Sequence, residues 1–430
     1  MSTKYCLWAG LAACLASPLW ATPDLQRPAA PDSNRQGNAP LRAFVERLWS
    51  DSPAVQGAQA AAAAATAQAA GAARPLHNPS LALDAERTDV TTASIGVSQT
   101  LDWSDKRSVR HDLALSEVQI AEAELAATRR RVAAEALDAL VAYETAGKIQ
   151  TLAQRRARLM QRFADTVERR YRAGDMGALD RALARLAYSE ALMQQAARES
   201  ERAQAEAALR AVSGFDVAHW PRLPEVFRPP SEPAPPDVLI GRLPELQVLQ
   251  SRLTVAAARL RLARKERRPD PTVGLRAGRE GGEALLGLSL ELPLFVRNDF
   301  SEAVQAAAHS QGQQEQAYRE ARRRALARYQ GALARFKNAF GAWNTWVATG
   351  QQAHREQMDL LERMWQAAEL TATEYLVQAR QNVDTQAAAM TLRGQVWHAA
   401  IAYLAASGRL ETWLGLAKLP AGQSAPAARR

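Results

Sequence analysis

The sequence repeats itself once, with a period of about 190 residues, and this duplication limits the folds that the chain can adopt. Four short landmarks recur in the same order in both halves. They are Ser52–Val55 with Leu243–Leu246, Asn78–Leu81 with Asp270–Val273, Val97–Leu101 with Leu288–Leu292, and Ser213-Gly214 with Ser407-Gly408. Because the order is kept, we expect two structural repeats built in the same way, over residues 41–214 and 241–416.

Each repeat contains two segments in which apolar and polar residues alternate, the pattern of a β-hairpin. We expect hairpins over residues 79–102 and 271–295, and Gly281-Gly282 supplies the turn of the second. One side of these strands is apolar. The other side carries charged and hydroxyl residues, namely Asp84, Glu86, Ser98, Arg276 and Glu291.

A short helix precedes each hairpin, at about 53–73 and about 244–267, and a long segment without proline follows it. The predicted long helices are 104–172 and 299–369, with returning helices at 177–213 and 373–407. At 1.5 Å per residue, each long helix would extend about 100 Å. A heptad seam indicates packing against another helix. It consists of Tyr329, Leu333, Phe336, Phe340, Trp343 and Val347.

The remaining segments lack these patterns. A proline-rich stretch, 215–240, joins the repeats and is expected to be an extended linker. Residues 22–40 and 417–430 are expected to be a flexible N-terminal segment and a flexible tail.

The first 21 residues resemble an export signal, with Lys4 before an apolar stretch and Ala21 at the cleavage position. A second interpretation is open, because Leu11–Cys14 resembles a lipobox in which Cys14 would carry the lipid. Both cysteines of the chain lie in this segment, so a processed chain would have no disulfide.

Composition argues for helices and against several classes of function. Apolar residues make up 47% of the chain and aromatic residues only 6%, and alanine supplies much of the difference. The net charge is +9, but the arginines lie among Glu and Gln along helical segments, which favours solvated helix faces over nucleic-acid binding. The six histidines have no metal-ligand spacing, and no phosphate loop or nucleophile motif occurs, so no enzyme, cofactor or metal site is expected.

Beyond residue 21 no stretch offers 18 uncharged apolar residues, so any membrane crossing would have to use the strands. Four strands cannot close a barrel, and open sheet edges in lipid leave backbone groups unpaired at a large cost in free energy. The chain would therefore have to oligomerise, although this argument requires only a closed multiple of four strands; 12 strands would be enough for a water-filled lumen. The alternative is a soluble sheet with one buried face.

The duplicated order of hairpin and long helical pair resembles the TolC-type outer-membrane efflux protein family, over about residues 40–416. Arg169–Asp175 resembles the tyrosine–glycine motif of this family at the helical turn. Pro79 and Pro271 match its prolines before the strands. Within the family, the chain looks closest to the outer-membrane component of heavy-metal efflux systems. The second turn, 369–374, lacks the glycine found at Gly174, which leaves open whether the two turns match.

The resemblance implies a mainly α protein with a transmembrane β portion. Three chains would form a 12-stranded β-barrel in the outer membrane and an α-helical barrel in the periplasm. The function implied is a passive exit duct of a tripartite efflux system, with a periplasmic adaptor protein and an inner-membrane pump as partners. The likeness to heavy-metal efflux components favours heavy-metal cations as cargo, and an organic compound is the alternative. Two alternatives remain: a periplasmic adaptor, which would normally carry a single helical hairpin, and a structural coiled-coil envelope protein.

Three sets of residues are candidates for function. Carboxylates near the turns would form rings of negative charge at a periplasmic gate, although they could instead cap the following helices. These are Asp175, Asp180, Glu369 and Glu374. The candidates for adaptor contact are Tyr171, Arg172 and Gly174, of which the glycine also suits a helix C-cap. Trp103 and Phe295 follow the strands and are candidates for the membrane interface or for packing at the strand–helix junction.

Overall fold

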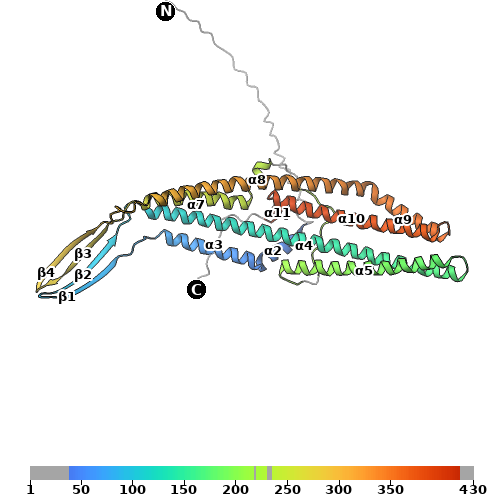
Figure 1. The fold of residues 1–430 in the computed structure, drawn as a ribbon, viewed down its shortest axis with the longest axis horizontal. Coiled ribbons are helices and arrows are strands. Elements are labelled where there is room, and N and C mark those ends of the chain that lie inside the picture. The colour runs from blue at the N-terminus through green and yellow to red at the C-terminus, as the bar shows by residue number, and fades with distance from the viewer. Residues whose placement is uncertain (1–37, 217–218, 230–234, 417–430) are drawn as a thin grey trace, which may run out of the picture.

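The computed structural model describes residues 38–216, 219–229 and 235–416. The molecule is elongated, with a sheet at one end, long helices through the middle and two helical turns at the opposite end (Figure 1). The first half of the chain contains α2 (Ala39–Asp51), α3 (Pro53–Ala72), β1 (Ser80–Arg87), β2 (Thr91–Thr100), α4 (Lys106–Arg172) and α5 (Ala178–Ser213). The second half contains α6 (Pro236–Gly241), α7 (Pro244–Glu266), β3 (Thr272–Glu280), β4 (Glu283–Glu291), α8 (Ser301–Thr345), the π-helix η1 (Trp346–Gly350), α9 (Gln351–Gln366), α10 (Ala372–Ala406) and α11 (Leu410–Trp413).

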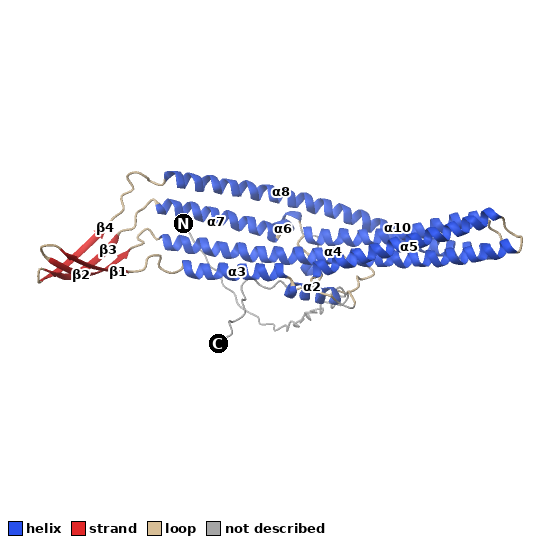
Figure 2. Ribbon diagram, turned by 60° about the horizontal axis from the view of Figure 1, so that its bottom comes forward, coloured by secondary structure: helices blue, strands red, loops and turns tan. Residues whose placement is uncertain are grey.

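All four strands belong to one antiparallel sheet in the order β1-β2-β3-β4. The two hairpins therefore join through the central pair, β2 and β3, which comes from different halves of the chain. Within the described residues, the outer edges of β1 and β4 have no partner strand. Figure 2 shows the sheet extending beyond the ends of the helices rather than packing against them.

The long helix α4 has 67 residues and runs about 100 Å at the standard helical rise. It contacts α3 and α7 on the sheet side and α5 and α10 on the turn side. Its buried positions are mostly small or aliphatic, which allows neighbouring helices to approach closely. One helix thus packs against both halves of the chain over the whole body.

The long helical segment predicted over 299–369 contains a π-helical turn, Trp346–Gly350, which separates α8 from α9. A Cβ added to Gly350 would lie 2.4 Å from Cε3 of Trp346. The indole therefore occupies the space beside this turn, which leaves no room for a side chain at position 350. Of the predicted seam, Tyr329 and Phe336 are buried, whereas Val347, inside η1, is 46% exposed.

The N-terminal boundary also differs from the prediction, since helix α2 begins at Ala39 inside the segment expected to be flexible. Leu41, Phe44, Val45 and Leu48 follow helical spacing, and all four side chains are buried. Asn38 is buried as well, and its Nδ2 donates to the carbonyl of Trp413 at 2.9 Å. Burial of one apolar helix face fixes this segment on the body.

The described part of the proline-rich stretch packs against the helical body instead of forming an extended linker. Leu223 and Phe227 are buried in the largest apolar cluster, and the N–H of Leu223 donates to Glu144 at 2.8 Å. The predicted linker 215–240 also contains most of α6, which begins at Pro236. Proline suits the first position of a helix, and Leu239 and Ile240 then bury their side chains against α8.

No helix in the described ranges combines the length and apolar character needed to cross a membrane. The predicted signal segment, 1–21, and the proposed lipidation position, Cys14, lie outside the described residues.

Candidate functional site

One face of the sheet is a continuous apolar surface. Residue pairing aligns Leu81, Val97, Leu275 and Leu288 in a row across all four strands. These side chains are 64%, 52%, 57% and 81% exposed, although leucine and valine are usually buried in water-soluble proteins. A neighbouring row contains Leu83, Ile95, Ala277 and Leu286. An apolar surface of this extent marks an interaction with another protein or with lipid.

The opposite face of the sheet is built from small and polar residues. Ser80 and Ser98 share a hydrogen bond of 2.9 Å between their hydroxyl oxygens, as do Thr100 and Thr272 at 2.8 Å. At Gly278 the backbone of β2 approaches so closely that an added Cβ would lie 2.2 Å from the carbonyl oxygen of Ala93. This side of the β2–β3 pair therefore tolerates no side chain at position 278.

The two predicted interface aromatics lie at the junctions between strands and long helices. Trp103 is 66% exposed, and its Nε1 donates to the carbonyl of Pro269 at 2.8 Å. Phe295 packs edge-on against Phe300, with 4.9 Å between ring centroids. Phe300 and Asp105 both have left-handed backbone, with φ of 59° and 55°, directly before α8 and α4. The two junctions therefore turn in the same way in both halves.

The two helical turns at the other end have the same backbone geometry, although only the first contains glycine. At Gly174, φ is 86°, and the N–H of the next residue, Asp175, donates to the carbonyl of Arg170 at 2.9 Å. At Ala368, φ is 60°, and the N–H of Glu369 donates to the carbonyl of Met364 at 2.9 Å. Both are helix C-caps that close on a left-handed residue. Two of the candidate gate carboxylates, Asp175 and Glu369, thus occupy equivalent, exposed positions.

The other two candidate gate carboxylates cap the returning helices. Asp180 accepts a hydrogen bond from the N–H of Gly177 at 3.3 Å, and Glu374 accepts one from the N–H of Thr371 at 2.9 Å. Glu374 also accepts the hydroxyl hydrogen of Thr371 at 2.7 Å. The backbone N–H and then the hydroxyl of Thr371 hold the pKa of Glu374 below its usual value. Asp180 and Glu374 therefore occupy the N3 position of helix N-terminal capping motifs.

Two of the candidates for adaptor contact, Tyr171 and Arg172, belong to a charged cluster around Glu168. This carboxylate pairs with Arg172 at 3.2 Å, Arg181 at 2.9 Å and Arg185 at 3.3 Å. The Arg181 guanidinium also lies over the ring of Tyr171, at 4.8 Å from its centroid. Tyr171 is half-buried by this contact, whereas Arg172 and Gly174 stay exposed at the turn.

Sequence reasoning missed an aromatic cluster just behind the turns. Phe163 of α4 stacks on Tyr375 of α10 at 5.3 Å, and Tyr375 stacks on Trp365 of α9 at 4.8 Å. Burial, together with Glu362 at 3.1 Å, raises the pKa of the Tyr375 hydroxyl. The spacing of Met160, Phe163 and Val167 in α4 was a usable signal. Through this cluster, the turn end of α4 in the first half packs against α9 and α10 in the second half.

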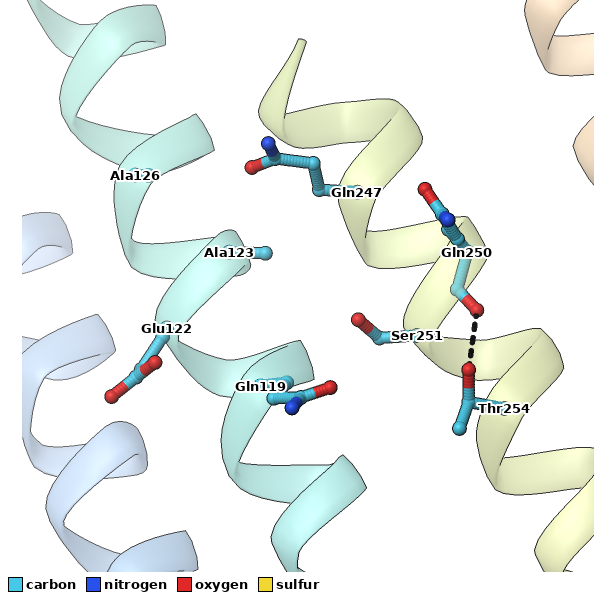
Figure 3. Close-up of a pocket in the computed structure, with 8 residues that line it drawn as sticks. All are labelled: Gln119, Glu122, Ala123, Ala126, Gln247, Gln250, Ser251 and Thr254. Carbon is cyan, nitrogen blue, oxygen red and sulfur yellow. Dashed lines mark hydrogen bonds between the residues drawn. The ribbon is translucent and has the colours of Figure 1, made fainter. Parts of the chain in front are cut away.

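Along the sheet-side half of the body, the contact between α4 and α7 is polar. A cleft of about 370 Å³ lies between these helices. Figure 3 shows Gln119 of α4 and Gln247 and Ser251 of α7 projecting into it. Ion pairs reinforce the contact, between Arg252 and Glu124 at 2.9 Å and between other residues of the two helices. The lining amides and hydroxyls provide neither a nucleophile–base pair nor a metal-ligand set. In the described parts of the chain, no three His, Cys, Asp or Glu side chains gather to hold a metal ion.

Comparison with known proteins gives consistent results. The sequence profile described as outer membrane efflux protein matches residues 45–215. The cobalt-zinc-cadmium resistance protein CzcC of Cupriavidus metallidurans is 28% identical over 243 residues, which span 53% of this chain and 56% of that protein. The chain thus aligns with about half the length of this curated relative.

Solved structures extend the likeness to nearly the whole chain. The MtrE outer membrane channel of Neisseria gonorrhoeae superposes with a TM-score of 0.73 at 18% identity, over 89% of this chain and 94% of MtrE. The outer membrane protein VceC of Vibrio cholerae gives a TM-score of 0.72 at 18% identity, over 88% of this chain and 99% of VceC. CusC gives 0.71 at 16% identity, over 86% and 92% of the two chains.

The duplicated hairpins, the exposed apolar sheet and the long helical body define a chain with the fold of outer-membrane channel proteins. Residues 45–215 match the outer membrane efflux protein family, and the fold of the chain is similar to that of solved outer-membrane channels, in line with the resemblance to TolC-type proteins. By their descriptions, VceC and MtrE are an outer membrane protein and an outer membrane channel.

Proposed function

We propose that this chain is the outer-membrane channel subunit of a tripartite efflux system, and that it provides a passive exit duct for heavy-metal cations. The observation that carries the proposal is a four-stranded sheet with an exposed apolar face and two unpaired edges, within the described residues. In lipid, such edges must pair with strands of other copies, because unpaired backbone groups are costly there. Three copies supply 12 strands around a lumen lined by the polar face.

The helical body supports a continuous duct. Helices α4 and α8 each extend from the sheet toward the turns, so three copies place a wall of long helices below the strands. The polar sheet face and the polar contact between α4 and α7 suit a wall that meets water on one side. The energy for transport then comes from an inner-membrane pump, reached through a periplasmic adaptor that docks near Tyr171, Arg172 and Gly174.

The cargo follows from the relative CzcC, whose name assigns it to cobalt, zinc and cadmium resistance. A duct does not need to bind its cargo tightly, since a tight site would slow passage. We propose that Asp175 and Glu369, which are exposed at equivalent positions of the two turns, face the narrow end of the duct. Repeated around a threefold axis, they give six carboxylates that favour cations.

Disulfide cross-linking between strand edges tests the trimer directly. A cysteine at Asp84 on edge strand β1 is combined with a cysteine at Gly287, Ser289 or Glu291 on edge strand β4. For at least one pair we expect oxidation to produce covalent dimers and trimers in outer-membrane preparations, because β1 of one copy pairs with β4 of the next.

The matched control places the first cysteine at Ser94 on central strand β2, whose two neighbours already belong to the same chain. This control should give no cross-links between chains. If none of the edge pairs forms a covalent oligomer, or if the purified protein is monomeric and soluble without detergent, the channel proposal is wrong.

A further inference from the structure

A second cleft, distinct from the sheet and the turns, lies where α10 ends and α7 begins. Figure 1 shows these two helices in line beneath α8. The cleft has a volume of about 490 Å³. We call it the junction cleft; it is lined by Arg130 and Arg131 of α4, Arg328 and Arg335 of α8, Leu243 before α7, and alanines of α4, α8 and α10.

The junction cleft carries unbalanced positive charge. Four arginines line it, against one carboxylate, Glu245. Arg328 and Arg335 are exposed and have neither an ion pair nor a hydrogen bond with any described residue, whereas Arg131 pairs only with exposed Glu135 of its own helix. The N-terminus of the 23-residue helix α7 adds a partial positive charge.

Arg130 is the buried arginine of the junction cleft. It is 8% exposed, and its Nε donates to Glu411 at 3.0 Å. Its Nη1 is also buried but has no hydrogen-bond partner within the described chain. An unpaired buried donor on a charged group is costly, and Arg130 is one of the residues that line the cleft.

We propose that the junction cleft binds a small organic anion. Its phosphate, sulfate or carboxylate group contacts the guanidinium groups, which match oxyanions through paired N–H donors. Its apolar part lies on the alanine surface, which includes Ala332, Ala402 and Ala405. A cleft of this volume suits a small molecule.

The place of the cleft in the fold favours a soluble anion over a lipid headgroup. The whole length of α7, about 35 Å at the helical rise, separates the cleft from the strands. Because the cleft is formed by helices from both halves, an anion bound there would link them. Binding to the folded state alone raises the stability of that state by mass action.

Calorimetric titration of the full-length protein in detergent tests this proposal. The probes are phenyl phosphate and inorganic phosphate, each at constant ionic strength set with chloride. We expect saturable binding of phenyl phosphate, a rise in melting temperature, and weaker binding of inorganic phosphate, which has no apolar part. The double variant Arg328→Gln/Arg335→Gln should weaken phenyl phosphate binding at least tenfold.

The matched control is Arg261→Gln/Arg264→Gln, two exposed arginines of α7 outside the cleft, which removes the same charge and should leave binding unchanged. Absence of saturable binding by wild-type protein, or an equal loss in both double variants, would overturn the anion site. Equal affinity for both probes would overturn the role of the alanine surface. None of these measurements depends on channel activity, so failure of the duct proposal would be recognised separately.

Discussion

Ala368 occupies, in the second helical turn, the left-handed backbone conformation that Gly174 occupies in the first, with φ of 60° and 86°. Left-handed backbone is unfavourable for alanine because its Cβ crowds the following carbonyl. The second turn therefore retains strain that glycine relieves in the first. The capping hydrogen bonds on both sides of Ala368 hold the strained conformation in place.

This relationship predicts opposite effects of exchanging the two residues. Ala368→Gly should raise the free energy of unfolding by about 1 kcal/mol, and Gly174→Ala should lower it by about 1 kcal/mol. Nothing lies within 4 Å of a Cβ built on Gly174, so the effect comes from the backbone alone. Denaturant unfolding of the purified protein measures both changes. Gly57→Ala, in the interior of α3, is the control and should be stabilising; a destabilising Ala368→Gly would contradict the strain argument.

A second prediction concerns Glu144 of α4, which forms hydrogen bonds with the proline-rich stretch and with α10. It accepts hydrogen bonds from the N–H of Leu223 at 2.8 Å and from Arg393 at 3.1 Å, and it pairs with Lys148 at 2.9 Å. Glu144→Gln leaves the Arg393 side chain, 11% exposed, without its carboxylate. We expect a loss of about 2–3 kcal/mol in the free energy of unfolding, measured with denaturant. Glu135→Gln, which breaks only an exposed pair with Arg131, should cost less than about 0.5 kcal/mol.

Glu144 also predicts a dependence of stability on pH. Burial alone would raise its pKa, but the hydrogen bonds from Lys148, Leu223 and Arg393 outweigh burial and hold the pKa below the ordinary value of 4.5. The stabilisation is therefore present above pH 4.5 and is lost as the pH falls through the lower pKa of the folded protein. The difference in stability between wild type and Glu144→Gln should shrink in this acidic range. A constant difference down to pH 2 would contradict the assignment.

Because β2 and β3 approach closely at one point, two glycines on the same sheet face should differ sharply in how well they tolerate substitution by alanine. Gly278→Ala places a Cβ against the carbonyl of Ala93 and should cost about 2–3 kcal/mol, since the backbone must move. Gly287→Ala makes the same change beside the flexible side chain of Arg276, with the nearest atom at 3.7 Å, and should be tolerated. The yield of folded oligomer in outer membranes measures both. Equal yields of the two variants would mean that the backbones of β2 and β3 lie farther apart at Gly278 than this argument requires.

The proposed carboxylate ring predicts a change in ion selectivity. Asp175→Asn/Glu369→Gln should lower the preference for cations over anions severalfold in planar bilayers, because the charge at the narrow end is removed. Asp180→Asn/Glu374→Gln weakens helix capping and should act mainly on stability. Unchanged currents in the first double variant would remove Asp175 and Glu369 from the gate.

Much of the architecture follows from local patterns. Alternation at Leu81, Leu83, Ile95 and Val97 predicted the strands and their apolar face, because side chains of a strand alternate between its two sides. The bounds of α4 were close to the prediction, since no proline interrupts that segment. Helix α2 was missed because its apolar face follows a segment without a clear pattern, although Leu41, Phe44, Val45 and Leu48 have helical spacing.

Non-local contacts decided the rest. The described part of the proline-rich stretch lies on the helical body because a core built from both halves of the chain accepts Leu223 and Phe227, and because Glu144 of α4 accepts the N–H of Leu223. Propensity acts over a few residues, whereas this outcome reflects the packing of segments distant in sequence.

The sequence by itself determined the duplication, the hairpins, the long helices and the resemblance to a family of outer-membrane efflux proteins, because periodicity and repeats are written along the chain. Only the tertiary structure brought β2 beside β3, Phe163 beside Tyr375, and Arg130 beside Arg328 in the junction cleft. The members of each pair come from different halves of the chain. They meet because burial of apolar helix faces and pairing of strand edges are satisfied only when the two repeats pack together.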